Sequence, residues 1–144
     1  MTQLGISRQP IIAVVIRVLV VFDALALLFA AALHVAGANI PLGAATFNEP
    51  QIVPAAIVEG LAGLLFVVSG YGVFVGKRWA WTSALVAHLF AILGFIVGLL
   101  ATLNGTSPFN YAYHRVMLVI FVIGVILLVT RSARTALARG ESEG

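Results

Sequence analysis

The sequence contains no cysteine and very few charged residues. The absence of cysteine excludes disulfide bonds, thiolate nucleophiles and thiolate metal ligands. Charged residues make up 9% of the 144 residues, whereas soluble domains contain about 25%. So few charges cannot cover a water-exposed surface, and 62% of the residues are hydrophobic, with a mean hydropathy of +1.13. This composition predicts an integral membrane protein whose first partner is the lipid bilayer.

The sequence also lacks the short motifs that mark many soluble enzymes. It has no glycine-rich phosphate loop, no His-Glu-x-x-His metal motif and no nucleophile elbow. Its net charge of +3 comes from basic residues near the ends of apolar segments rather than from a basic patch. The sequence therefore favours a non-enzymatic protein without excluding an enzyme, and it predicts no nucleic-acid binding.

Four long apolar segments dominate the chain. Each has more than the roughly 20 residues that cross about 30 Å of hydrocarbon. Ser107-Pro108 favours the start of the last helix, because serine caps a helix and proline suits its first position. The predicted fold is an all-α membrane protein, a four-transmembrane-helix up-down bundle in a single domain of residues 1–131, followed by a polar tail of residues 132–144. We predict the helices at about 11–36, 52–75, 79–102 and 108–130.

The basic residues indicate how the helices are oriented in the membrane. All but Arg115 lie on or near one side of the predicted bundle. Since cytoplasmic loops are enriched in lysine and arginine, we expect both termini and the tail to be cytoplasmic, in a bacterial-type cytoplasmic membrane. The linker 37–51 is then external. It is apolar but contains glycine and proline, so we expect it either to lie on the membrane surface or to fold over the bundle as a lid.

Ionisable residues inside the predicted helices are the candidates for function, because such groups are costly in lipid and normally face the bundle interior. Counted at about 1.5 Å per residue, they form two tiers. Glu59, His114 and Arg115 lie in the outer tier, with His34 nearer the external surface. Asp23 and His88 lie deeper. Tyr111, His114 and Arg115 share one face of the last helix.

Two pairs follow from these depths. Glu59 and Arg115 have opposite charges at similar depth, so we expect an ion pair. It either fixes the docking of two helices or belongs to a site in which Arg115 clamps an anionic group. Asp23 and His88 are expected to form a buried pair, either structural or able to handle protons, because histidine titrates near neutral pH.

A cofactor is a further alternative. His34, Glu59 and His114 could bind a transition metal, since imidazole and carboxylate suit zinc, iron or manganese. The signal is weak, because no two of these residues stand at a known ligand spacing and Arg115 opposes a cation. A haem b held by two histidines requires imidazoles at matched depth, and the three histidines lie at different depths.

Glycines recur on the second and third predicted helices, including Gly94 and Gly98. Small residues let helices approach closely in lipid, so these glycines indicate tight packing within the bundle or a seam for a homo-oligomer or a membrane-complex partner.

The leading functional hypothesis is a small membrane protein with an internal polar site near the external face, which binds a small ligand, ion or cofactor. The alternatives are a structural or accessory subunit of a larger membrane complex and a proton-coupled small-molecule transporter. The expected ligand-binding residues are Glu59, Tyr111, His114, Arg115, Asp23 and His88.

Overall fold

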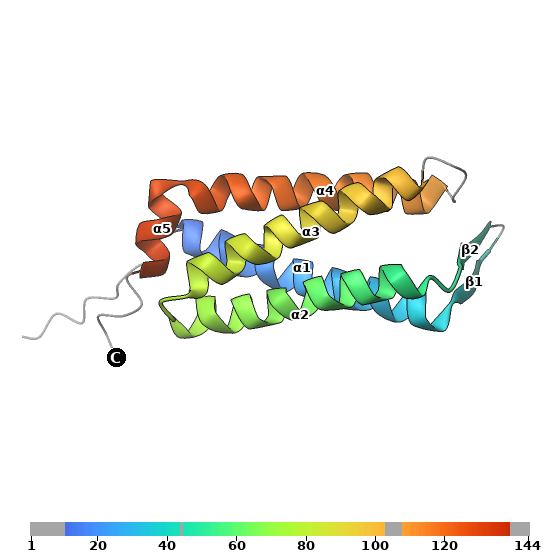
Figure 1. The fold of residues 1–144 in the computed structure, drawn as a ribbon, viewed down its shortest axis with the longest axis horizontal. Coiled ribbons are helices and arrows are strands. Elements are labelled where there is room, and N and C mark those ends of the chain that lie inside the picture. Colours follow the sequence, from blue (N-terminus) through green and yellow to red (C-terminus); the bar gives the residue numbers. More distant parts are fainter. Residues whose placement is uncertain (1–10, 44, 103–107, 139–144) are drawn as a thin grey trace, which may run out of the picture.

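The computed structural model describes residues 11–43, 45–102 and 108–138. Four long helices lie side by side along the long axis of the molecule (Figure 1). All four are long and apolar enough to cross a membrane, which confirms the prediction of a helical integral membrane protein. Their bounds differ from the predicted ones by no more than one residue. The helices are α1 (Ile11–Ala36), α2 (Val53–Val75), α3 (Ala80–Thr102) and α4 (Pro108–Val129).

The helices pack in sequence order, with α1 against α2, α2 against α3 and α3 against α4. The contact between α4 and α1 is much smaller. Small residues on α3 allow this close packing, since Ala84, Ala87 and Ala91 are all buried. Phe66 of α2 and Phe121 of α4 are fully buried at the centre, with ring centroids 5.9 Å apart. The bundle is therefore well packed on three sides and loosely closed between α1 and α4.

The outer surfaces of the helices are apolar. Large hydrophobic side chains such as Leu25, Leu93 and Val97 are about two-thirds exposed. In a soluble protein such extensive apolar exposure would cause association, whereas lipid tails cover it without cost. The exposed surface therefore fits a bilayer environment.

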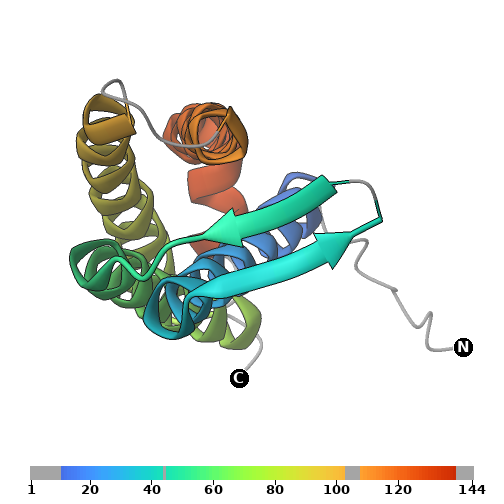
Figure 2. The same ribbon diagram turned by 90° about the vertical axis from the view of Figure 1, so that its right-hand side faces the viewer.

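The linker between α1 and α2 forms a β-hairpin, β1 (Ala38–Leu42) and β2 (Ala45–Glu49), so the all-α prediction is wrong for this segment. Gly37 and Gly43 both have a φ of 66°, a left-handed conformation that glycine adopts without strain. Gly37 ends α1 and Gly43 lies in the hairpin turn. The strands pair Ile40 with Phe47. Figure 2 shows the hairpin lying across one end of the bundle, which agrees with the lid alternative.

A short helix, α5 (Arg131–Ala138), lies at the opposite end of the bundle (Figure 1). It buries Ala133 and Leu137 against the other helices. Nearby, the indole N–H of Trp81 donates to the carbonyl of Leu128 at 2.8 Å, and the Arg134 guanidinium lies 4.6 Å from the Trp81 ring centroid. The predicted polar tail therefore begins with a packed helical turn, and its last six residues lie outside the described part of the chain.

Candidate functional site

The hairpin end of the bundle buries a histidine between two carboxylates. His34, near the end of α1, lies with its Nδ1 3.4 Å from Oε1 of Glu49 and with its Nε2 3.5 Å from Oε2 of Glu59. Glu49 comes from β2 and Glu59 from α2. All three side chains are 4–6% exposed. We call these three residues the His34 triad.

The hairpin positions Glu49 through strand geometry and a contact with α4. Residues two apart on a strand share a face, so Phe47 and Glu49 both point to the same side of β2. The Phe47 ring packs edge-on against Phe109 of α4 at 4.8 Å. The Asn110 side-chain amide donates to Oε1 of Glu49 at 3.1 Å. Burial raises the pKa of the Glu49 carboxyl above its ordinary value, and the adjacent His34 partly offsets the rise.

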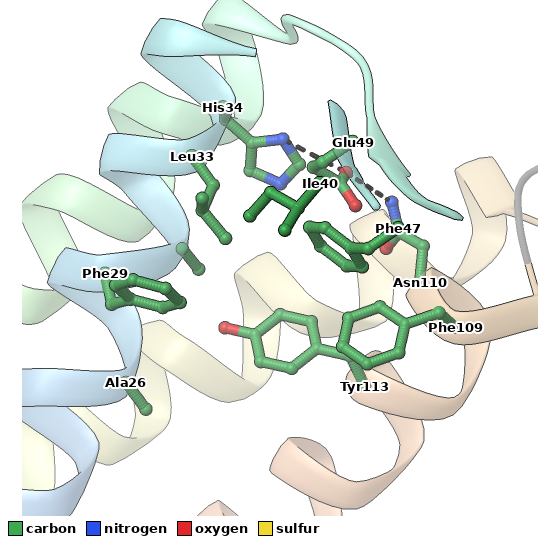
Figure 3. Close-up of a pocket in the computed structure, with 11 residues that line it drawn as sticks. Ala26, Phe29, Leu33, His34, Ile40, Phe47, Glu49, Phe109, Asn110 and Tyr113 are labelled. Carbon is green, nitrogen blue, oxygen red and sulfur yellow. Dashed lines mark hydrogen bonds and ion pairs between the residues drawn. The ribbon is translucent and has the colours of Figure 1, made fainter. Parts of the chain in front are cut away.

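A cavity of about 400 Å³ lies between α1 and α4, below the hairpin. Its walls are mostly apolar and aromatic, with polar groups from His34, Glu49, Asn110 and Tyr113 (Figure 3). The Tyr113 hydroxyl is buried, makes no hydrogen bond to any residue that the structure describes, and points towards α1. Phe29, which lines the same cavity, is 65% exposed on the outer surface, so the cavity reaches the lipid-facing side of the bundle. We call it the α1–α4 cavity.

A second cavity of about 410 Å³ lies between α2 and α3 and touches the start of α4. It is lined by Glu59 and His114 and by the aromatic rings of Phe90 and Phe95. Both oxygens of Glu59 are buried and accept no hydrogen bond from the described part of the chain. We call this space the α2–α3 cavity. The His34 triad therefore lies between two cavities, with Glu49 lining one and Glu59 lining the other.

Deeper in the bundle, the structure brings Asp23 of α1 and His88 of α3 together, as expected. Nε2 of His88 is 3.4 Å from Oδ2 of Asp23, and the two residues are 1% and 0% exposed. Nδ1 of His88 is 2.7 Å from the carbonyl oxygen of Ala84, which can only accept a hydrogen bond. The Nδ1 atom therefore carries a hydrogen, and Nε2 faces the carboxyl group. We call Asp23 and His88 the central pair.

Glycines make room for two of the histidine rings. A Cβ atom at Gly124 of α4 would collide with the His88 ring, and one at Gly98 of α3 would collide with the His114 ring. Nδ1 of His114 lies 2.9 Å from the backbone carbonyl of Asn110. The small residues predicted on α3 therefore pack against other helices of the same chain. Gly94 also lies directly against Val58 of α2.

The predicted ion pair between Glu59 and Arg115 is wrong, because the Glu59 carboxyl group lies beside His34, with Oε2 3.5 Å from Nε2. Arg115 is exposed, and its guanidinium lies 5.5 Å from the ring centroid of Tyr111, which is 36% exposed. The helical-face argument failed because His114 and Arg115 are consecutive, about 100° apart around α4. Burying His114 therefore turns Arg115 outward, away from both cavities.

The structure does not bring His34, Glu59 and His114 together as ligands of one metal ion. Within residues 11–43, 45–102 and 108–138, no three His, Asp or Glu side chains are arranged to hold a metal ion. The two nitrogens of His34 point in different directions, one to Glu49 and the other to Glu59, so His34 and both carboxylates cannot bind the same ion. The rings of the other two histidines are enclosed in the bundle, where His88 faces Asp23 and His114 packs on Gly98.

Sequence reasoning missed two residues of the site, Glu49 and Asn110. Neither is among the candidates predicted from the sequence, because Glu49 lies in the linker and Asn110 lies in the first turn of α4. A usable signal was present, because Glu49 is one of only three acidic residues before the tail, and all three are buried. In a chain so poor in charge, each acidic residue of the membrane domain is a site candidate.

Comparison of the chain with models of protein families, with curated proteins and with solved structures finds no match to any of them. The geometry of the chain therefore carries the functional argument.

Proposed function

We propose that this protein is a small integral membrane protein that binds an amphipathic organic cation, such as a protonated amine, in the α1–α4 cavity. Its four helices cross a cytoplasmic membrane in up-down order. Lys77, Arg78, Arg131 and Arg134 gather at the α5 end, which supports a cytoplasmic position for that end and for both termini. The hairpin and both cavities then lie on the external side.

The observation that carries the proposal is the buried Glu49 carboxyl at the wall of an otherwise apolar cavity. A buried carboxylate is stable only when it is paired or protonated. Its neighbours in the described chain are His34 and the amide of Asn110, and no lysine or arginine lines either cavity. A ligand that brings a positive charge would complete this site, whereas an anion would be repelled.

The remaining cavity walls suit such a ligand. Ligand sites typically have volumes of about 300–1,000 Å³ and walls that are mainly apolar and aromatic, with few polar groups. The rings of Phe29, Phe47, Phe109 and Tyr113 line the space and can attract a cation through their faces. The unpaired hydroxyl of Tyr113 supplies one further hydrogen-bond partner.

Binding of phenethylamine to the purified protein tests this proposal, with the uncharged phenethyl alcohol as the matched ligand control. A hydrogen bond to a charged group contributes about 1.5–3 kcal/mol, so Glu49→Gln should weaken binding of the amine in the α1–α4 cavity roughly 10- to 100-fold. Arg115→Gln, on the outward face of α4, should leave the Kd unchanged. Equal affinities for amine and alcohol, or wild-type occupancy of the α1–α4 cavity by the amine in Glu49→Gln, would count against a cation site in that cavity.

A proton-coupled transporter is the second candidate, and the observation that favours it is the central pair. Asp23 and His88 lie below the His34 triad and can hold a proton between them. In liposomes, transport of the amine should then depend on a pH gradient and stop in Asp23→Asn. An accessory subunit of a membrane complex is the outcome to accept instead if the wild-type protein binds no ligand and co-purifies with other subunits.

A further inference from the structure

The His34 triad connects two cavities of nearly equal size, and each cavity has one carboxylate. Glu49 lines the α1–α4 cavity and Glu59 lines the α2–α3 cavity, while the His34 ring lies between them with one nitrogen towards each. The two carboxylates are therefore linked through a group that can gain a proton on one nitrogen while it loses a proton from the other.

The burial of the triad limits its charge. Two buried carboxylates without a lysine or arginine would be strongly destabilised if both were ionised beside a neutral ring. The other polar groups that face the triad come from α4 and are Asn110, Tyr113 and His114, while the residues of α3 that line the α2–α3 cavity are uncharged. The stable arrangement has two transferable protons among the three side chains and a net charge of −1.

We infer that His34 lets Glu49 and Glu59 share a single negative charge, so that one organic cation binds in the α1–α4 cavity or in the α2–α3 cavity but not in both at once. This inference rests on the proposed cation site. In the transfer, the contacts of 3.4 and 3.5 Å on the two sides of His34 first shorten to hydrogen bonds. Protonated Glu49 then gives its proton to Nδ1 of His34, and Nε2 gives its proton to the Glu59 carboxylate. No proton is gained or lost, and the negative charge moves from Glu59 to Glu49.

The α2–α3 cavity has what a second cation site requires. Glu59 is 4% exposed and neither of its oxygens accepts a hydrogen bond from residues 11–43, 45–102 or 108–138, so a ligand amine would supply donors. Phe90 and Phe95 provide aromatic walls. Leu93 and Val97 line the cavity and are 65% and 67% exposed, so this site also reaches the lipid-facing surface. An amphipathic cation can approach either site from the bilayer.

The number of bound phenethylamine molecules and their position test the inference. Native mass spectrometry of the full chain at neutral pH should show one amine per protein at saturation. A benzylamine carrying a photoreactive diazirine should label the α2–α3 cavity in Glu49→Gln, because the charge then resides on Glu59. In Glu59→Gln it should label only the α1–α4 cavity. Arg115→Gln should behave like the wild type, and circular dichroism should confirm that each variant is folded.

The outcomes separate the inference from the proposed function. Two amines bound at once to the wild-type protein would refute a shared charge and leave the cation site in place. Labelling of the wild type in the α1–α4 cavity, with no labelling of folded Glu49→Gln, would also refute the shared charge and leave the cation site in place. The charge would then not move to Glu59. Absence of amine binding in the wild type and in both variants would overturn the proposed function together with this inference.

Discussion

Replacing Asp23 by asparagine should have little effect on stability, whereas replacing its partner His88 by alanine should be severe. The reason lies in the hydrogen bond from Nδ1–H of His88 to the Ala84 carbonyl. This bond leaves Nε2 of the neutral ring as an acceptor, 3.4 Å from a carboxyl oxygen of Asp23. Two acceptors attract each other only if a proton lies between them. An asparagine amide can donate to Nε2 and replace that shared proton.

The expected magnitudes differ enough to be measured. Asp23→Asn keeps the shape and the contact, so we expect it to change the free energy of unfolding by about 1 kcal/mol or less, the net worth of one hydrogen bond. His88→Ala leaves a fully buried carboxyl group without its partner, which typically costs about 1–3 kcal/mol. It also removes a ring that packs at 4.7 Å from Phe66, and the resulting cavity adds to the loss.

Unfolding of the purified protein by SDS in mixed micelles, followed by circular dichroism, would measure both changes. The double variant completes a cycle that isolates the coupling between the two side chains. The variant Ser83→Ala is a useful control, because it alters a partly buried hydroxyl of the same helix away from the pair. If Asp23→Asn proved as destabilising as His88→Ala, the pair would be held by full charges, and the shared-proton argument would fail.

Three further predictions concern the hairpin end of the bundle. The pKa of Glu49 is raised above 4.5 in the folded state, so the folded protein holds this proton more tightly than the unfolded chain does. The free energy of unfolding should therefore fall by up to about 1.4 kcal/mol per pH unit as the pH rises from 4.5 to the folded pKa. Melting curves across pH should show a smaller slope in Glu49→Gln than in the wild type. Gly98→Ala should destabilise the folded protein by about 1–3 kcal/mol, because its Cβ would meet the His114 ring. In the matched control Gly60→Ala the Cβ would lie 3.8 Å from its nearest neighbour, so this variant should unfold like the wild type in the same SDS titration. Arg115→Gln should change the free energy of unfolding by no more than about 0.5 kcal/mol, since its side chain is exposed, and a loss of several kcal/mol would restore the ion pair with Glu59.

The sequence predicted the helices well and the site only in part, for a physical reason. Helix bounds depend on local signals such as length, hydropathy and the proline at position 108, which survive in any tertiary context. The hairpin depends on Gly37 and Gly43, and its apolar residues resemble those of a surface segment. Site partners depend on the rotation of each helix about its axis. Asp23 and His88 are the only ionisable groups at their depth, so their pairing follows from depth alone.

The contacts of the outer tier were harder to predict, because several polar residues lie at a depth similar to that of Glu59. Arginine at the same depth was the obvious choice by charge, but the rotation of α4 that buries His114 makes Arg115 face outward. Depth estimates also placed His34 nearer the surface, while the hairpin covers it and brings Glu49 to its second nitrogen. A covering strand cannot be inferred from helix geometry, so the central contact of the site could not be derived.

The two tiers differ in how completely their polar groups are enclosed, and this difference indicates separate roles. The central pair is surrounded by core side chains, and a series of aromatic contacts runs from His88 through Phe66, Phe121 and Phe95 to His114. His34 lies eleven positions after Asp23 on α1, or about 16 Å along the helix, too far for direct proton transfer. These rings would therefore have to move before a proton could pass between the tiers. We accordingly expect the central pair to fix α1 against α3, and the His34 triad, bordered by two cavities, to meet the ligand.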